Sequence, residues 1–463
     1  MIKAIVGSGG KTTLLKKMAE EYCSQGKSVF ATTSTHMLIE EDTLLTDDAD
    51  AIIQVLNEKG YVMAGVECGQ KIKALSEETY LAVCKHADVV LVEADGSKHM
   101  PLKYPNDTEP VIPINTEEIV VVCGLHALGK KAKDVCHRLE LVKECLQIED
   151  DTIITAKHIQ ELVTKGYLEP LSEKYPDKKI TLEPRHDGTL YQKVISSLLQ
   201  EKADVSYIRE EWFLPQPRLF VCGCGHIGRE VAALAAKLDF LVTVFDNRED
   251  LASKERFPTV DRIICDDYEN LERYMEAGAY YVVVTPDHKA DLLCVRKILP
   301  TKYAYLGMMG SKKKVQSTFE NLRKENFSKE QVSTIFAPIG LAIGAVTPAE
   351  IAISILGQMI QEKNKTHAAS ADRRLLEAKS AGVLCVIIEK NGSAPRGVGS
   401  MMYVGEEEIL GSIGGGETEY IAIQDAKEMK TVTVREYVLN SSGENGLDVI
   451  CGGCIKVMFI PVK

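Results

Sequence analysis

The sequence lacks the features that direct a chain to a membrane or to nucleic acid. No apolar run approaches the ~18 residues that span a bilayer, and Gly7 comes too early for a secretory signal core. Lysine and arginine number 55 against 67 aspartate and glutamate residues, so the formal charge is -12. Nucleic acids and anionic membranes need a basic field, which this balance does not supply. We therefore expect a cytoplasmic protein that binds neither.

A disulfide framework and a closed zinc site are also missing. The 13 cysteines form an odd set without regular spacing. Several, such as Cys84 and Cys123, stand in apolar stretches, where reduced cysteine behaves as a small hydrophobic residue. Cys451 and Cys454 do not complete a zinc site, because no histidine follows His367 and two thiolates are too few. We expect free thiols.

The composition and two interruptions of the strand and helix pattern predict three domains. With 463 residues, 45% of them hydrophobic, the chain has enough material for two to four cores. A proline-containing stretch at 210–218 and a polar stretch at 361–374 interrupt otherwise regular strand and helix patterns. The predicted α/β fold has an N-terminal P-loop-like parallel-sheet domain (1–210), a central Rossmann-like doubly wound domain (216–363) and a small C-terminal α+β domain (370–463).

A glycine-rich turn near the N-terminus predicts a phosphate site. The segment IVGSGGKTT (5–13) follows an apolar strand and opens a helix, whose N-terminus adds positive potential. The full P-loop pattern places a glycine where Ile5 stands, so we read this turn as a shortened loop into which the strand continues. A plain strand-to-helix turn is the alternative. The expected nucleotide-binding residues are Gly7, Ser8, Gly9, Gly10, Lys11, Thr12 and Thr13, and Lys11 is also a catalytic candidate.

A second strand end offers carboxylates for magnesium. The stretch VVLVEADGS (89–97) is an apolar strand that ends in Glu93 and Asp95. P-loop proteins hold Mg²⁺ with a loop hydroxyl and a strand-end carboxylate, so the expected metal ligands are Thr12, Glu93 and Asp95. Taken alone, the pair reads equally well as an Asp-Gly turn. The sequence does not choose between ATP and GTP.

The middle of the chain carries a Rossmann-type turn. Gly223, Gly225 and Gly228 form G-x-G-x-x-G between a strand and a helix, and Asp246 ends the next strand about 20 residues later. A carboxylate at that place accepts ribose hydroxyls, so NAD fits better than NADP if a dinucleotide binds. The alternative, in which the glycines serve helix packing, is the stronger one, and NAD is not the favoured cofactor. His226 and His288 are further candidate contacts at this crevice.

Three short motifs in the last domain suggest an anion site. NGSAPRGVGS (391–400) offers Arg396 as a bidentate phosphate partner, and GSIGGGE (411–417) is a glycine turn that opens a helix. In CGGC (451–454), Cys451 stands beside glycines, as a reactive or cofactor-contacting thiol would. Each motif alone also reads as a tight turn of small residues.

These motifs resemble two known families. The middle and last domains resemble the XdhC/CoxI family of accessory proteins for molybdenum hydroxylases such as xanthine dehydrogenase, with the glycine-loop unit after the Rossmann-like unit in permuted order. The first domain resembles the YqeC family, which is linked to selenium-dependent molybdenum hydroxylases. The matching strings are GCGHIG, TPDHKAD, YLGMMGSKKK, APIGLAIGAVTPAEIAISI, GSAPRG, GSIGGGE and CGG for the first family, and GSGGKTT, TTSTHM, VEADGS and EPVIP for the second.

The resemblance implies a maturation role. It implies binding of molybdenum cofactor (molybdopterin), its sulfuration or selenation, and its insertion into a target enzyme, with a sulfur or selenium donor protein as a second partner. The family's arginine two places before His288 is Pro286 here, which puts an anion contact from that loop in doubt. The cofactor would be lined by Gly392, Ser393, Pro395, Arg396, Gly414, Gly415, Gly416 and Cys451, with Cys451 as the catalytic thiol.

Three functions remain open from the sequence. The first is a maturation factor whose P-loop domain hydrolyses a nucleotide. The second is an NAD-dependent oxidoreductase, although His288 is its only nearby acid-base candidate. The third is a non-catalytic carrier of molybdenum cofactor in which the nucleotide acts as a switch. Selenium against sulfur, the target hydroxylase and a homodimer all stay undecided.

Overall fold

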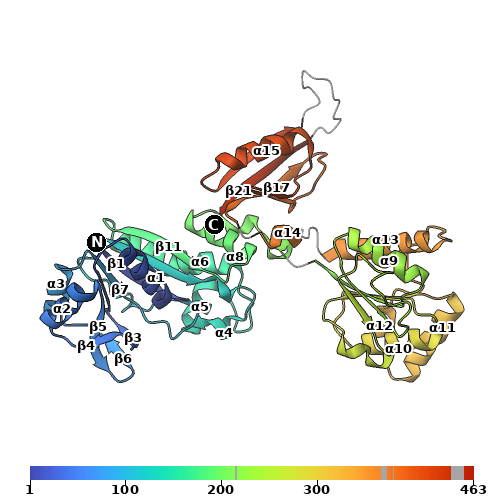
Figure 1. Cartoon of the computed structure of the whole chain (residues 1–463), viewed down its shortest axis with the longest axis horizontal. Coiled ribbons are helices and arrows are strands. Elements are labelled where there is room, and N and C mark those ends of the chain that lie inside the picture. Colours follow the sequence, from blue (N-terminus) through green and yellow to red (C-terminus); the bar gives the residue numbers. More distant parts are fainter. Residues whose placement is uncertain (214–215, 367–372, 379, 440–452) are drawn as a thin grey trace, which may run out of the picture.

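The first part of the chain forms a largely parallel sheet in the computed structural model (Figure 1). The structure describes residues 1–213, 216–366, 373–378, 380–439 and 453–463. The strand order is β11-β9-β1-β7-β2-β5-β6-β3, and β4 pairs with β5. The strands are β1 (Ile2–Gly7), β2 (Val29–Thr33), β3 (His36–Leu38), β4 (Thr43–Leu45), β5 (Tyr61–Cys68), β6 (Lys71–Lys73), β7 (Val89–Glu93), β9 (Glu118–Gly124) and β11 (Lys179–Arg185).

The central strands of this sheet are apolar because both of their faces are covered. Every residue of β7 and β9 is buried, which explains the nearly unbroken apolar runs that the sequence shows there. A separate two-stranded sheet joins β8 (Leu102–Lys103) to β10 (Cys136–His137). The helices are α1 (Lys11–Ser24), α2 (Ala49–Lys59), α3 (Glu77–Cys84), α4 (Ala132–Val135), α5 (Leu139–Leu146), α6 (Ala156–Val163), α7 (Glu169–Lys174) and α8 (Leu190–Gln200).

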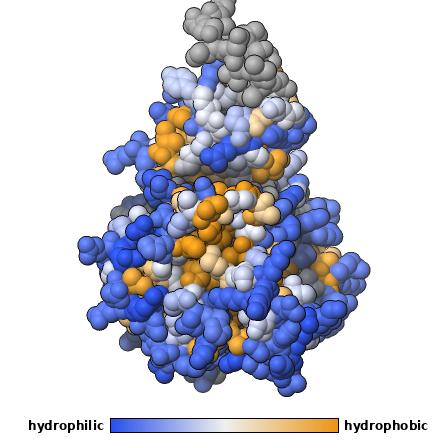
Figure 2. All heavy atoms as spheres, turned by 90° about the vertical axis from the view of Figure 1, so that its right-hand side faces the viewer, coloured by the Kyte–Doolittle hydropathy of each residue, from blue (hydrophilic) through white to orange (hydrophobic). Residues whose placement is uncertain are grey.

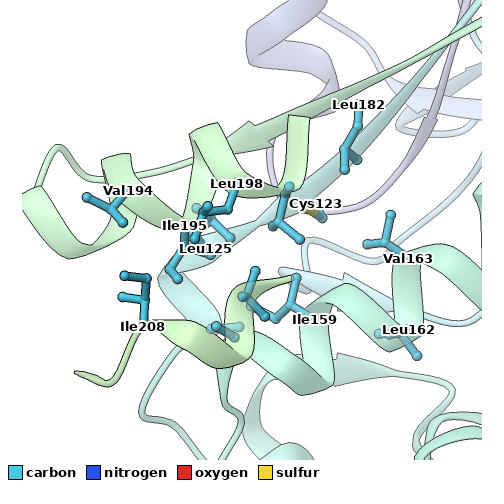
Figure 3. Close-up of a cluster of buried hydrophobic side chains, with 14 of the residues drawn as sticks. Cys123, Leu125, Ile159, Leu162, Val163, Leu182, Val194, Ile195, Leu198 and Ile208 are labelled. Atoms are coloured by element: carbon cyan, nitrogen blue, oxygen red, sulfur yellow. The ribbon is translucent and has the colours of Figure 1, made fainter. Parts of the chain in front are cut away.

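A buried cluster fastens β9 and β11 to α6 and α8 (Figure 3). Cys123 and Leu182 project from the strands toward Ile159 of α6 and Ile195 of α8, and each of these side chains is 9% exposed or less. Burying an isoleucine or leucine side chain contributes about 1.5–3 kcal/mol. The cluster therefore fixes the carboxyl ends of β9 and β11 firmly beside the glycine-rich turn.

The middle part of the chain is a doubly wound parallel sheet, as predicted. Its strand order is β14-β13-β12-β15-β16, and all its pairs are parallel. α9 and α13 pack on one face, and α10, α11 and α12 on the other. The elements are β12 (Arg218–Cys222), α9 (His226–Lys237), β13 (Leu241–Asp246), β14 (Arg262–Cys265), β15 (Tyr280–Val283), α10 (His288–Ile298), β16 (Tyr305–Met308), α11 (Lys312–Lys324), α12 (Lys329–Ser333) and α13 (Pro348–Thr366).

The last part is the predicted small α+β unit, built on an antiparallel sheet of order β19-β18-β17-β21-β20. One face packs on α15, and the other packs on α8 of the first part. Ser197 Oγ donates a hydrogen bond to the carbonyl of Pro461 at 2.6 Å, which ties the two parts together. The elements are α14 (Arg373–Leu376), β17 (Gly382–Asn391), β18 (Met401–Gly405), β19 (Ile409–Gly411), α15 (Gly416–Glu428), β20 (Thr433–Leu439) and β21 (Gly453–Val462).

The first and last parts thus share one core, whereas the Rossmann-like part stands beside them (Figure 1). The face seen from the Rossmann side is mostly hydrophilic, with an apolar area near its centre (Figure 2). Among the described residues, no helix combines the length and the apolar character needed to cross a bilayer.

Candidate functional site

The glycine-rich turn between β1 and α1 has a backbone that only glycine fits. Gly7, Gly9 and Gly10 have φ angles of 91°, 85° and 124°. A Cβ atom on Gly7 would lie 2.1 Å from the carbonyl oxygen of Val122. Ile5 is fully buried inside β1, so the strand does continue where the longer motif has its first glycine. The turn is short because β9 presses directly against it.

The amides of this turn divide into bonded and open groups. We expected the Ser8 amide to face a phosphate, but it donates a hydrogen bond to the carbonyl of Val122 at 2.9 Å. Helix α1 begins at Lys11 after Gly10, and no side chain caps its N-terminus. The first amides of an uncapped helix point outward with unsatisfied donors, which is the arrangement that binds phosphate.

Lys11 lies folded over the turn. Its ammonium donates to the Gly7 carbonyl at 2.8 Å and to Ser97 Oγ at 3.2 Å, and it lies 3.8 Å from Glu93 Oε1. Burial lowers the pKa of Lys11, and the nearby carboxylates oppose that shift. A buried cation with one distant carboxylate partner is well placed to move onto a phosphate oxygen.

Thr12 and Glu93 meet at the predicted metal site. Thr12 Oγ1 donates to Glu93 Oε2 at 2.7 Å. Burial raises the pKa of Glu93, whereas Lys11 and the Thr12 hydroxyl lower it. A hydroxyl and a carboxylate in contact at the edge of a phosphate loop are suitable oxygen ligands for Mg²⁺.

Asp95 differs from its predicted role as a metal ligand. The side chain is fully buried, and its Oδ2 accepts hydrogen bonds from Gly7 N at 3.1 Å and from the Tyr167 hydroxyl at 2.7 Å. Its Oδ1 pairs with Lys103. Because Asp95 points behind the turn, it holds the glycine backbone in place instead of facing a ligand.

A charged network extends this support away from the turn. Lys103 also pairs with Glu109, which accepts a second bond from Arg138 Nη1 at 2.7 Å. Burial by itself would raise the pKa of Glu109, but the bonds from Arg138 and Lys103 outweigh it and lower the pKa to about 2. Glu109 therefore remains charged and holds Arg138 in a fixed position.

The turn opens into a cavity of about 740 Å³. This volume lies in the upper part of the range typical of small-ligand sites. Five of the chain's ten histidines line it, in a protein whose overall charge is -12. The cationic and histidine side chains of the lining are Lys11, Lys16, His36, Lys71, Lys98, His99, His126, His137, Arg138, Arg185 and His186.

Most of these lining residues were missed by sequence reasoning. His126 follows β9, His137 ends β10, Arg138 lies between β10 and α5, and Arg185 ends β11. The signal was available, because the carboxyl ends of parallel strands meet at one edge of a sheet. The stretches carry no glycine motif, however, and Arg138 directly follows β10, a strand too short to be predicted.

The Rossmann turn is built around its glycines and Asp246. A Cβ atom on Gly228 would lie 1.9 Å from the carbonyl oxygen of Gly223, so these two positions serve close packing. A Cβ atom on Gly225 would meet no other atom within 4 Å, so that place is open. Asp246 accepts Cys224 N at 2.7 Å and the guanidinium of Arg248. Its carboxylate is committed to the turn and to Arg248, and it is fully buried.

The predicted histidine contacts of this part lie at the surface. His226 and His288 are both exposed, each as the first residue of its helix. Asp287, before His288, caps α10 by accepting the amides of Lys289 and Ala290. Neither histidine has a hydrogen bond or an ion pair that fixes it toward the Gly225 opening in the described part of the chain.

The loops predicted to bind molybdenum cofactor come together in the last part. A Cβ atom on Gly414 would lie 3.3 Å from Pro395, next to Arg396, and one on Gly453 would lie 2.3 Å from the Ser393 carbonyl. Arg396 is exposed, and Gly392 has a φ of 75°. Cys451 lies outside the described residues.

The glycine turn at 411–417 contains an internal anion. Glu419 Oε2 accepts hydrogen bonds from the amides of Ile413 at 2.9 Å, Gly414 at 3.2 Å and Gly415 at 3.0 Å. Burial raises the pKa of Glu419, but Ser412 and these amides outweigh that effect and lower it. The amides that we expected to bind a ligand anion are thus satisfied by this carboxylate, because Glu419 lies in the first turn of α15.

Three family models match successive parts of the chain. Residues 3–140 match the YqeC protein family, residues 219–359 match the XdhC Rossmann domain, and residues 375–437 match the XdhC and CoxI family. These are the families that the sequence motifs resemble.

Several known proteins are similar to parts of this chain. The chain is similar to an uncharacterized protein, YqeB, of Escherichia coli K12, at 29% identity over 41% of this chain and 34% of the relative. It is similar to an uncharacterized protein, YqeC, of the same organism, at 30% identity over 35% of this chain and 66% of the relative. A probable xanthine dehydrogenase subunit of Bacillus subtilis is 28% identical over 33% of this chain and 44% of the relative.

The chain thus spans between about a third and two thirds of these relatives. Among solved structures, a xanthine dehydrogenase of Bacillus halodurans is 27% identical over 33% of this chain and 44% of that one, with a TM-score of 0.30. On the family matches, the chain is a fusion of a YqeC-type segment with an XdhC Rossmann domain and a segment of the XdhC and CoxI family.

Proposed function

We propose that this chain is an accessory factor for molybdenum hydroxylases, and that its YqeC-type part binds a magnesium nucleoside triphosphate. The observation that carries the nucleotide site is the meeting of four features in one cavity: the uncapped start of α1, the Lys11 ammonium, the Thr12 hydroxyl and the Glu93 carboxylate. The accessory role rests on the XdhC-type segments.

The charges of the site suit this ligand. Phosphate oxygens would replace the Gly7 carbonyl and Ser97 as partners of Lys11, which already lies over the turn. When bound with the nucleotide, Mg²⁺ would supply positive charge against the phosphate oxygens. Thr12 and Glu93, whose side-chain oxygens are 2.7 Å apart, would hold the ion, and Asp95 would keep the turn in shape from behind.

For the last part we propose molybdenum cofactor as the ligand, held by the loop at 392–396 and Cys451. Arg396 is exposed beside the glycine turn, so its guanidinium has the reach and the free geometry for a phosphate. The amides at 413–415 are occupied by Glu419, so we assign the phosphate to Arg396 and not to this turn. A sulfur or selenium donor protein and a target hydroxylase are the partners of this proposal.

Calorimetric titration of the full chain with ATP and with GTP, each with Mg²⁺, tests the nucleotide site. Lys11→Met should weaken the better nucleotide at least about tenfold, or about 1.4 kcal/mol, because the phosphate loses its buried cation. Lys17→Met is the matched control on the same helix, since Lys17 is exposed and pairs only with Glu21 among the described residues. Nucleotide binding that survives Lys11→Met would remove the P-loop assignment.

Co-purification tests the cofactor proposal. The chain, expressed in cells that make molybdenum cofactor, should carry bound pterin, and Arg396→Ala should lose most of it. Pterin bound without nucleotide hydrolysis would favour a carrier over a maturation enzyme. A nicotinamide-dependent absorbance change in a pterin-free chain would instead support an oxidoreductase and overturn the proposal.

A further inference from the structure

One wall of the nucleotide cavity carries cations from two turns. Lys98 and His99 stand between β7 and β8, whereas His137 ends β10 and Arg138 stands between β10 and α5. β8 pairs with β10 in parallel, with His137 opposite Lys103. This small sheet therefore holds both turns side by side, and we call the four residues the cationic wall.

The cationic wall lies next to the place where the terminal phosphate of a nucleotide would bind. Ser97, immediately before Lys98, contacts the Lys11 ammonium at 3.2 Å. On the other side, Arg138 is positioned by Glu109 at 2.7 Å. An anion lying against this wall would therefore be held close to Lys11.

The charge of the wall is only partly balanced. Glu109 neutralises part of the charge of Lys103 and Arg138. In the described part of the chain, no carboxylate forms an ion pair with Lys98, which is exposed to the cavity. Burial lowers the pKa of His137, and the charges of Arg138, Lys103 and Lys98 lower it further. A bound anion would offset the repulsion between these positive charges.

The backbone of the wall adopts conformations that most side chains avoid. Lys98, His99 and Arg138 have φ angles of 47°, 62° and 58°, and they are three of seven described non-glycine residues with positive φ. Such left-handed conformations are unfavourable for residues other than glycine, and they cluster at functional sites where the surrounding structure holds them in place. Both turns thus hold their cations toward the cavity at a cost in stability.

We infer that the cationic wall is a second anion subsite, which binds a phosphate- or carboxylate-bearing substrate against the terminal phosphate of the nucleotide. The inference rests on the proposed nucleotide site. It makes the YqeC-type part a two-ligand module instead of a switch that binds a nucleotide alone. The substrate is a small molecule, because it shares a cavity of about 740 Å³ with the nucleotide.

Other cationic side chains of the cavity lie beside the glycine-rich turn and are not part of the cationic wall. Arg185 lies against Gly10, and its Cγ is 3.3 Å from the position of a Cβ on that glycine. His126 and His186 follow the neighbouring strand ends. These groups stand on the side of the glycine-rich turn, so they are assigned to the nucleotide, and variants that test the second subsite must leave them intact.

The test uses the double variant Lys98→Asn/His99→Asn, because asparagine tolerates the left-handed backbone. Lys202→Asn is a matched control: Lys202 is exposed, has a φ of 56° and lies outside the nucleotide cavity. The full chain is saturated with Mg²⁺ and a non-hydrolysable analogue of the nucleotide that binds. Inorganic phosphate and, separately, acetate are then titrated calorimetrically.

The nucleotide-loaded wild type and the Lys202→Asn control should bind phosphate with equal affinity. The double variant should bind it at least about tenfold more weakly. The affinity for the nucleotide should change less than about threefold. Acetate binding with the same pattern would assign a carboxylate substrate, and phosphate binding alone would assign a phosphorylated one.

The inference is overturned if neither anion binds the nucleotide-loaded chain, or if the double variant binds them as the wild type does. Phosphate that binds only without nucleotide would occupy the glycine-rich turn and would also overturn it. If no nucleotide binds, the proposed function fails first. Phosphate titrations of the nucleotide-free wild type and double variant then decide the subsite separately, by the same difference in affinity.

Discussion

At the scale of single residues, Asp95 has a different role from the one its sequence position indicates. A carboxylate just after an apolar strand predicts a metal ligand, yet Asp95 accepts Gly7 N and the Tyr167 hydroxyl behind the turn. Tyr167 comes from a π-helical segment far along the chain, and no pattern in the sequence places it there. Glu93, two residues earlier, is the carboxylate that faces Thr12.

Asp95→Asn should therefore act through the shape of the turn. Replacing a charged acceptor of buried hydrogen bonds costs about 2 kcal/mol, so the free energy of unfolding should fall by that order in urea titrations. Nucleotide affinity should fall as well, while the requirement for Mg²⁺ should remain. Loss of the Mg²⁺ dependence alone, with unchanged stability, would return Asp95 to the metal site.

Glu109 predicts a dependence of stability on pH. Its pKa in the folded protein, about 2, lies below the ordinary value of 4.5. A carboxyl group with a depressed folded pKa stabilises the fold above its unfolded pKa, and this contribution is lost as the pH falls toward the folded value. Unfolding titrations between about pH 5 and pH 2 should show a smaller loss of stability in Glu109→Gln than in the wild type. Parallel pH curves for the two proteins would contradict this assignment.

At the scale of elements, the strands and turns could be predicted from the sequence better than the contacts between segments that are distant in the chain. The βα pattern, the short glycine-rich turn after β1 and the doubly wound order could all be read from apolar runs and glycines. The cationic wall could not, because His137 ends the two-residue strand β10 and the other three residues stand in turns whose left-handed backbones carry no glycine. Likewise, Glu419 was not recognised as the internal partner of the glycine turn, because that contact depends on the angle at which α15 begins.

The glycine-rich turn should tolerate no side chain at Gly7. Gly7→Ala would place a Cβ atom 2.1 Å from Val122 O, so β1 and β9 must separate at the turn. We expect loss of measurable nucleotide binding and a lowered melting temperature. Gly26→Ala is the control: Gly26 has a φ of 77° but no atom within 4 Å of its Cβ position. It should cost only about 1 kcal/mol of stability and leave nucleotide binding unchanged.

At the scale of the whole molecule, the last part is tied to the first and not to the Rossmann-like part that precedes it. Val194 and Leu198 of α8 share a core with Leu384 and Ile460 of the C-terminal sheet. Residues 185–187, a few positions before α8, line the cavity beside the glycine-rich turn. α8 therefore connects the wall of this cavity to the strand β21, which follows Cys451 in the chain.

Adjacent residues of β21 offer a matched pair for this interface. Ile460 points into the core shared with α8, whereas Phe459 points toward α15. Each truncation to alanine should cost about 2–5 kcal/mol. Ile460→Ala should speed hydrogen exchange in α8 as well as in the C-terminal sheet, and Phe459→Ala should speed it in the sheet alone. Equal exchange in α8 for both variants would contradict a shared core.

The measurement that tests the central claim most directly is hydrogen exchange of the full chain with and without Mg²⁺ and each nucleotide. The account predicts slower exchange at residues 9–13, at the start of α1, and at Lys98 and His99 of the cationic wall. Protection confined to the Rossmann turn at 223–228, or no protection at saturating nucleotide, would contradict it.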